Sequence, residues 1–173
     1  MGFTAAGINK DLVTTDQQAP LGFELTVPTA NAGNQIWIYV QCVTVALAEG
    51  LAAMRPDGAI TYTATPTTIA VNAVHPNRII GVAQHAIAIN SYGFILKNGL
   101  GSVQAGNGAV VAANTGLTTA GTGVDGTFAA AVTSTSNPTL DTHERIIAWC
   151  VTASAASGPA PAGIGKAMID CRG

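Results

Sequence analysis

Three histidines, His75, His85 and His143, are the side chains of this chain best suited to proton transfer or metal binding near neutral pH. A metal site needs three or four converging ligands, and the histidines show neither i, i+2 nor i, i+4 spacing, nor a carboxylate cluster beside them. Ser91, His85 and Asp141 could be combined into a nucleophilic triad, but no G-x-S-x-G motif supports one. We therefore predict no catalytic residue and no metal ligand, and we expect the protein not to be an enzyme.

A glycine motif formed by Gly121, Gly123 and Gly126 matches the pattern G-x-G-x-x-G. In dinucleotide-binding proteins this motif follows a strand and opens a helix, whose N-terminus meets the pyrophosphate. Here a polar loop precedes the motif, and the apolar run that starts at Phe128 leads into no amphipathic helix. We expect a loop rich in turn residues and no bound cofactor.

The three cysteines, Cys42, Cys150 and Cys171, form an odd number and contain no C-x-x-C spacing. Each lies in an apolar, strand-like stretch, where a reduced cysteine packs as a small hydrophobic residue. We predict buried free thiols, because a structural disulfide is uncommon in a reducing compartment.

The aromatic residues lie mostly within strand-like stretches, where core packing is the commoner role: Trp37, Tyr39, Tyr62, Tyr92, Phe94 and Trp149. A platform that stacks on sugar rings is the alternative. Trp37, Tyr62 and Trp149 are the candidates for such a platform.

The composition points to a protein that packs against partners. Charged residues make up only 9% of the chain, against roughly 25% in typical soluble domains, whereas 48% of the residues are hydrophobic. A surface with so few charges repels other copies weakly, although a biased, alanine-rich composition would explain the low charge too.

The seven basic residues are scattered and the net charge is −2, so we expect neither nucleic-acid nor membrane binding. The N-terminus lacks the pattern of a signal peptide, and residues 36–54 are too polar for a membrane span.

The pattern of short β-rich runs separated by turn residues predicts an all-β domain, a small β-barrel or a β-sandwich of short antiparallel strands. We place the domain at residues 35–173 and an extended N-terminal arm at 1–34, with one short strand at 23–27; terminal disorder is the alternative for the arm. A helix competes with strand over 45–54, but Gly50 disfavours it. The expected strands cover 35–48, 60–64, 69–74, 79–89, 94–97, 109–113, 127–132, 145–151 and 164–171.

Residues 78–103 form the longest strand-like stretch, and its opening Arg78-Ile79-Ile80 recurs as Arg145-Ile146-Ile147. We interpret both copies as strand–turn–strand units. Asn98-Gly99 by itself is a strong hairpin signal. However, Gly101 and Val103 continue the strand pattern, and a glycine inside a strand often marks a bulge.

The same stretch resembles the capsid decoration, or cement, proteins of tailed bacteriophages. The resemblance rests on RIIGVA at 78–83, NSYGFI at 90–95 and Asn98-Gly99, and extends over residues 35–171. This chain departs from the family in Ser91, where an acidic residue is usual, and in a longer proline-containing loop at 157–162. The resemblance favours one continuous strand through Asn98-Gly99.

For function, the resemblance implies an all-β subunit, typically a homotrimer, on the outer face of an icosahedral shell. Its partners would be the major capsid protein and further copies of itself, and it would be made in the bacterial host cytoplasm and located in the virion. The function expected from it is to stabilise the shell. A host-glycan-binding adhesin module of a phage tail or cell surface is the alternative.

Overall fold

The computed structural model describes residues 4–5, 8–30, 33–56, 62–66, 79–106, 112–119, 125–130, 148–152 and 164–171. These residues contain strands and turns but no helix, so the all-β prediction is confirmed and the helix considered for 45–54 does not form. It follows that the described part of the chain has no helix long and apolar enough to cross a membrane.

Ten strands form one mixed sheet, in the order β10-β9-β11-β12-β8-β7-β5-β6-β4-β3, and β1 and β2 form a separate two-stranded sheet. Neighbouring strands of the large sheet run antiparallel except β4 and β6, which are parallel. The strands are β1 Thr4–Ala5, β2 Ile8–Asn9, β3 Glu24–Thr29, β4 Gly33–Cys42, β5 Ala52–Met54, β6 Thr63–Pro66, β7 Ile79–Val82, β8 Tyr92–Gln104, β9 Gly116–Thr118, β10 Ala129–Ala130, β11 Ala148–Thr152 and β12 Ile164–Asp170.

Strands β4, β5, β6, β7 and β8 form a partial, barrel-like ring, because β4 also pairs with β8. The ring is incomplete where β7 meets β8, since only Val82 and Leu96 are paired there. All five strands contribute side chains to one buried cluster, and only the inside of the ring can bring them together. This inner cluster consists of Ile38, Val40, Cys42, Leu47, Ala53, Ala64, Ile80, Ala83, Ile87 and Ile95. The alternate residues of the same strands, such as Trp37 and Phe94, belong to a second cluster outside the ring.

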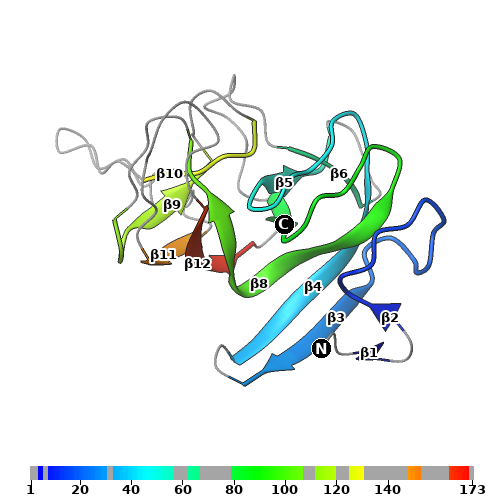
Figure 1. Cartoon of the computed structure of the whole chain (residues 1–173), viewed down its shortest axis with the longest axis horizontal. Helices are drawn as coiled ribbons and strands as arrows, with labels where there is room; N and C mark the ends of the chain where they lie inside the picture. The colour runs from blue at the N-terminus through cyan, green and yellow to red at the C-terminus, as the bar shows by residue number, and fades with distance from the viewer. Residues whose placement is uncertain are drawn as a thin grey trace.

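The longest strand, β8, crosses the whole molecule (Figure 1). It runs without a break through Asn98-Gly99, so the continuous strand is confirmed and no hairpin forms. The strand is bulged, because Ile36 pairs with Asn98 whereas the next residue, Trp37, pairs with Leu96. Gly99 has a φ of 120°, and a Cβ there would lie 2.9 Å from Cγ of Gln35, so this position requires glycine. Strand β8 pairs with β4 up to Asn98 and with β12 from Asn98 onward.

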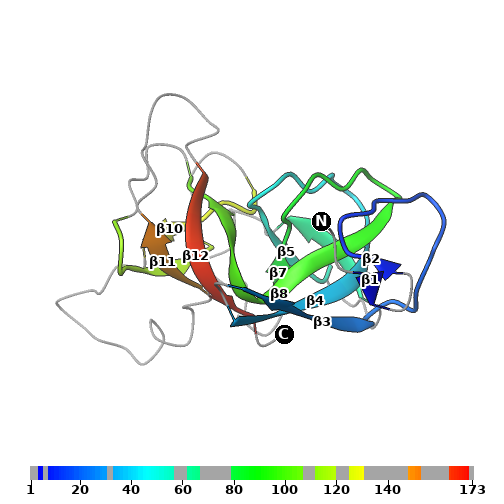
Figure 2. The same ribbon diagram turned by 60° about the horizontal axis from the view of Figure 1, so that its bottom comes forward.

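Beyond β8, strands β12, β11, β9 and β10 extend the sheet, and Figure 2 shows β12 between β8 and β11. Strand β9 lies between the strands expected at 109–113 and 127–132, where the sequence pattern predicted no strand. That expectation was wrong in this part because Leu117, although surrounded by turn-forming residues, is fully buried and pairs with Ala148. Neighbouring strands β11 and β12 pair as a strand–turn–strand unit should. Arg78 and Arg145, which carry the sequence repeat, lie outside the described residues, as do the strands expected at 69–74 and 109–113 (apart from residues 112–113).

The described part of the N-terminal segment lies on the sheet. The short strand expected near 23–27 is present as β3, which pairs with β4 along its whole length. Leu25 and Val27 point into the outer cluster, and Thr14 forms a bridge with Tyr92 of β8. Residues 8–30 are therefore ordered by the chain's own sheet, while the domain boundary at residue 35 stays a prediction.

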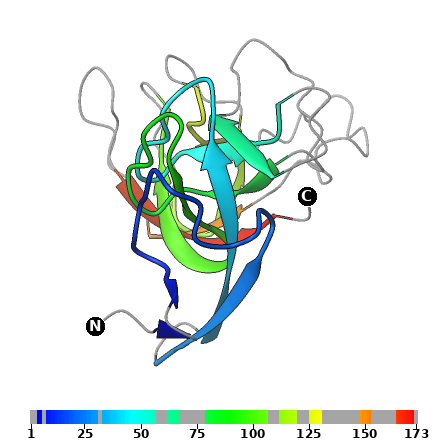
Figure 3. The same cartoon turned by 90° about the vertical axis from the view of Figure 1, so that its right-hand side faces the viewer.

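Two loops with the same order of bends, bridge and turn close one end of the ring: residues 43–51 between β4 and β5, and residues 83–91 between β7 and β8. They differ at their second residue, where Thr44 has a positive φ. Their sequences share the pattern A-L/I-A-x-G/N, and the last position of each, Gly50 or Asn90, has a positive φ. The loops interlock through backbone hydrogen bonds between Leu47 and Ile87. Figure 3 looks onto this end of the molecule.

Candidate functional site

The residues considered for catalysis are only partly described. His85 and Ser91 both lie in the 83–91 loop, whereas His75, His143 and Asp141 lie outside the described residues. Ser91 is buried, and its carbonyl oxygen accepts a hydrogen bond from the backbone N–H of Cys42. Within the described ranges, no three His, Cys, Asp or Glu residues come together as a metal site would require.

His85 has an unusual environment. Its Nε2 atom is buried and has no hydrogen-bond partner among the described residues. Burial lowers the pKa of His85 below its ordinary value, because a charged imidazolium would lose its hydration. The negative charges of Asp11 and Glu49 raise the pKa of His85, and the positive charge of Lys10 lowers it further. His85 is therefore held neutral in the folded protein.

The three thiols are free and buried, as predicted. Burial raises the pKa of Cys42 and of Cys150, and raises that of Cys171 to about 12, with a further contribution from neighbouring Asp170. A thiol must ionise to act as a nucleophile. These cysteines are thus packing residues at neutral pH.

The glycine motif is described only from its end. Gly121 and Gly123 lie outside the described residues, and Gly126 forms a turn with a φ of 84°. The residues after this turn form the bridge at Phe128 and strand β10, not a helix. The helix N-terminus that would bind a pyrophosphate is therefore missing at this point.

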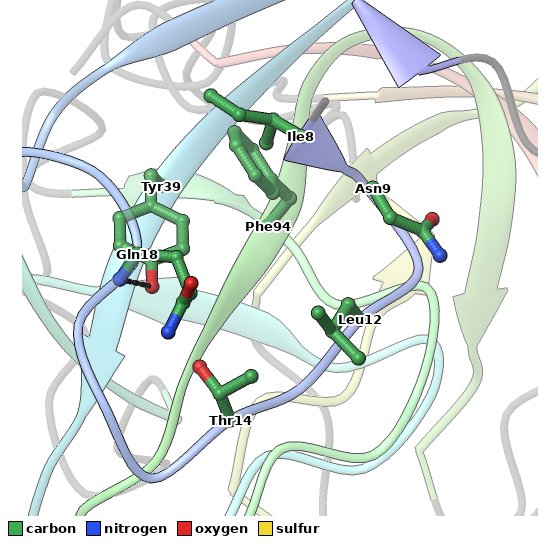
Figure 4. Close-up of a pocket in the computed structure, with 7 residues that line it drawn as sticks. All are labelled: Ile8, Asn9, Leu12, Thr14, Gln18, Tyr39 and Phe94. Carbon is green, nitrogen blue, oxygen red and sulfur yellow. Dashed lines mark hydrogen bonds between the residues drawn. The ribbon is translucent and has the colours of Figure 1, made fainter. Parts of the chain in front are cut away.

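A cavity of about 270 Å³ lies between the N-terminal segment and strands β4 and β8 (Figure 4). Tyr39 and Phe94 form its sheet side, and the hydroxyl oxygen of Tyr39 accepts a hydrogen bond from the backbone N–H of Gln18 at 2.9 Å. The described lining contains hydroxyls and amides but no carboxylate, imidazole or thiol. The described residues that line it are Ile8, Asn9, Leu12, Thr14, Gln18, Tyr39 and Phe94.

The candidates for a sugar-stacking platform are dispersed. Trp37 is buried beneath Lys10, whose Nζ lies 4.7 Å from the ring centroid, and its indole N–H donates to Gln35. Tyr62 is half-buried and lies under Arg55. Trp149 alone of these three candidates is widely exposed, at 53%.

Among the described residues, seven of the eight exposed large apolar side chains, all except Phe23, lie in two parts of the fold. The first, which we call the loop end, consists of Leu12, Val45 and Ile89, each between 47% and 50% exposed. They belong to the N-terminal segment and the two interlocked loops, on the right of Figure 1. The second, which we call the β12 face, lies at the opposite end on strands β11 and β12, and its apolar residues are Trp149, Val151, Ile164 and Met168.

Sequence patterns did not reveal these surfaces. In β12 the residues alternate between exposed and buried, but Ile164 and Met168 on the exposed side are as apolar as the buried ones. The two surfaces can bind an apolar partner. No protein-family model matches the chain, and neither does any curated protein sequence.

Proposed function

We propose that this protein is a structural component of a virion, which binds the outer surface of an icosahedral phage capsid and stabilises the assembled shell. The proposal starts from the resemblance of residues 78–99 to capsid decoration proteins. Its partners are the major capsid protein and further copies of the chain, in a homotrimer. A protein that binds only the assembled shell stabilises it by mass action, because disassembly then requires its release.

The observation that carries the proposal is the loop end. Leu12, Val45 and Ile89 expose apolar surface on loops that a network of backbone hydrogen bonds holds in place. A surface that is already ordered loses little conformational entropy on binding. It therefore suits repeated docking onto identical sites of a shell.

The adhesin alternative rests on Trp149, whose exposed indole could stack on a sugar ring. Trp37 is buried, so it does not extend such a platform. We retain the adhesin as the second candidate because of Trp149 alone.

The test uses purified protein and shells assembled from the major capsid protein encoded in the same genome. We expect the protein to co-sediment with the shells, to saturate at a fixed ratio to capsid subunits, and to raise the temperature at which the shells come apart. Ile89→Asp should weaken binding about tenfold, equivalent to about 1.4 kcal/mol. Thr26→Asp, on the exposed side of β3, is the matched control and should bind normally.

Failure of the wild-type protein to co-sediment would remove the proposal. So would quantitative mass spectrometry that finds only a few copies per virion, located at the tail. Binding to host glycans that is lost in Trp149→Ala would instead favour the adhesin.

A further inference from the structure

The β12 face has an apolar row at its centre. Trp149 of β11 pairs with Met168 of β12, and Met168 pairs with Leu100 of β8. Directly paired residues on one face of a sheet have adjacent side chains, so the three form a row across three strands. Trp149 is 53% exposed and Met168 is 43% exposed. This much apolar surface in one row is typical of an interface.

Two residues of opposite charge flank the apolar row. Lys166 and Asp170 lie on the same exposed side of β12, two residues before and two residues after Met168. The Nζ of Lys166 donates to Oγ of Ser102 at 2.8 Å, and Nδ2 of Asn98 donates to Oδ1 of Asp170 at 3.3 Å. These bonds to β8 hold both charged groups on the face. Each lies about 7 Å along the strand from Met168.

We propose that the β12 face binds the β12 face of a second copy of this chain, with a two-fold axis along the row Trp149–Met168–Leu100. Such an axis places the two β12 strands antiparallel, so Met168 meets its counterpart and Lys166 of each copy faces Asp170 of the other. Two-fold contacts require this kind of self-complementary surface. Sheets packed face to face lie about 10 Å apart at a small crossing angle, a distance that a lysine and an aspartate side chain bridge together. On association, Lys166 would exchange its bond to Ser102 for one to Asp170 of the second copy.

The charge pattern selects this arrangement over the other two-fold packing. An axis along β12 would place Lys166 against Lys166 and Asp170 against Asp170, and like charges in contact oppose association. The antiparallel arrangement makes both contacts between Lys166 and Asp170 attractive. The charge pattern thus points to a second copy as the occupant of the face.

The inference does not rest on the proposed function, because it uses the β12 face and the shell proposal uses the loop end. When every β12 face is paired, each copy has one partner through this face, so a closed assembly contains an even number of copies. Two trimers that pair all three faces with each other would form a hexamer. Sedimentation equilibrium of the full-length protein should therefore give an even multiple of the 17.3 kDa chain. A monomer or a trimer at every concentration would overturn the inference.

Met168→Cys tests the position of the axis. Because the axis passes beside this residue and the two sheets lie about 10 Å apart, a short bis-maleimide crosslinker, which reaches farther than a disulfide, should join two copies in high yield on a denaturing gel. Thr26→Cys, an exposed residue of β3, is the matched control and should remain uncrosslinked, as should the wild type with its buried thiols. A Met168→Cys protein that forms even-numbered assemblies but does not crosslink would place the contact elsewhere.

A charge exchange tests the register. Lys166→Asp and Asp170→Lys should each weaken association about tenfold, and the double variant should regain most of it. Circular dichroism of each variant checks that the fold is intact. If the double variant associates no better than the single variants, the proposed register is wrong.

Discussion

Leu47 and Ile87 exchange two backbone hydrogen bonds, with N–O distances of 3.0 Å and 2.8 Å, although neither lies in strands β1–β12. They occupy equivalent positions in the 43–51 and 83–91 loops, and both side chains are fully buried in the inner cluster. Further backbone bonds surround the pair, from Asn90 to Cys42 and from Gly50 to Ala83. Each loop thus supports the other.

Truncation of either residue should destabilise the whole ring. We expect Leu47→Ala and Ile87→Ala each to lower the free energy of unfolding by about 2–5 kcal/mol, because each leaves a cavity in a packed core. Val45→Ala, on the exposed side of the same loop, is the control and should change it by less than about 0.5 kcal/mol. Urea denaturation measures all three. Equal effects of Leu47→Ala and Val45→Ala would contradict the interlocked core.

The two loops should differ in their tolerance of side chains at the last position of the shared pattern. Gly50 has a φ of 81°, and a Cβ there would lie 2.7 Å from the backbone nitrogen of Gln104. Gly50→Ala should therefore lower the free energy of unfolding by more than about 1 kcal/mol. Asn90 has a φ of 62°, so Asn90→Gly relieves backbone strain and should change stability by less than about 1 kcal/mol. The urea midpoints should separate the two variants, and a neutral Gly50→Ala would be inconsistent with this geometry.

His85 should make the protein less stable in mild acid. Burial lowers the pKa of His85 below its ordinary value of 6.5, so the unfolded chain takes up the proton first as the pH falls. The stability that the neutral imidazole contributes is complete above pH 6.5 and is lost progressively below it, down to the lower pKa of the folded state. Asp11 and Glu49 reduce the size of this loss, and Lys10 increases it.

The comparison of wild type with His85→Gln isolates this residue from the other two histidines. The urea midpoint should fall when the pH is lowered from about 8 to about 5, and this fall should be larger in the wild type than in the variant. An equal fall in both proteins would show that His85 is not responsible.

The strands that the sequence patterns predicted are those whose own residues favour a strand, without reference to distant partners. Runs of β-branched and aromatic residues marked β4 and the first half of β8. The apolar context of Cys42, Cys150 and Cys171 predicted the burial of these three cysteines. The bulge near Gly99 could be anticipated because a glycine inside a strand pattern is a local sign of one.

The features that escaped prediction depend on partners far along the chain. Nothing near Leu47 indicates that it bonds to Ile87, and nothing near residues 63–64 indicates a parallel pairing with β4. Trp149 lies in a strand, as expected, but its exposure depends on which side of β11 the rest of the sheet covers. Periodicity cannot distinguish the two sides when both are apolar.

The division of β8 at Asn98 has a consequence for how the molecule unfolds. One half of this strand pairs with β4 of the ring and the other half with β12 of the extension, so the two parts of the sheet share a single element. Displacement of β8 would therefore break the hydrogen bonds to both strands at once. The sheet should therefore behave as one cooperative unit, and the amide protons of β8 should exchange with solvent only through global unfolding.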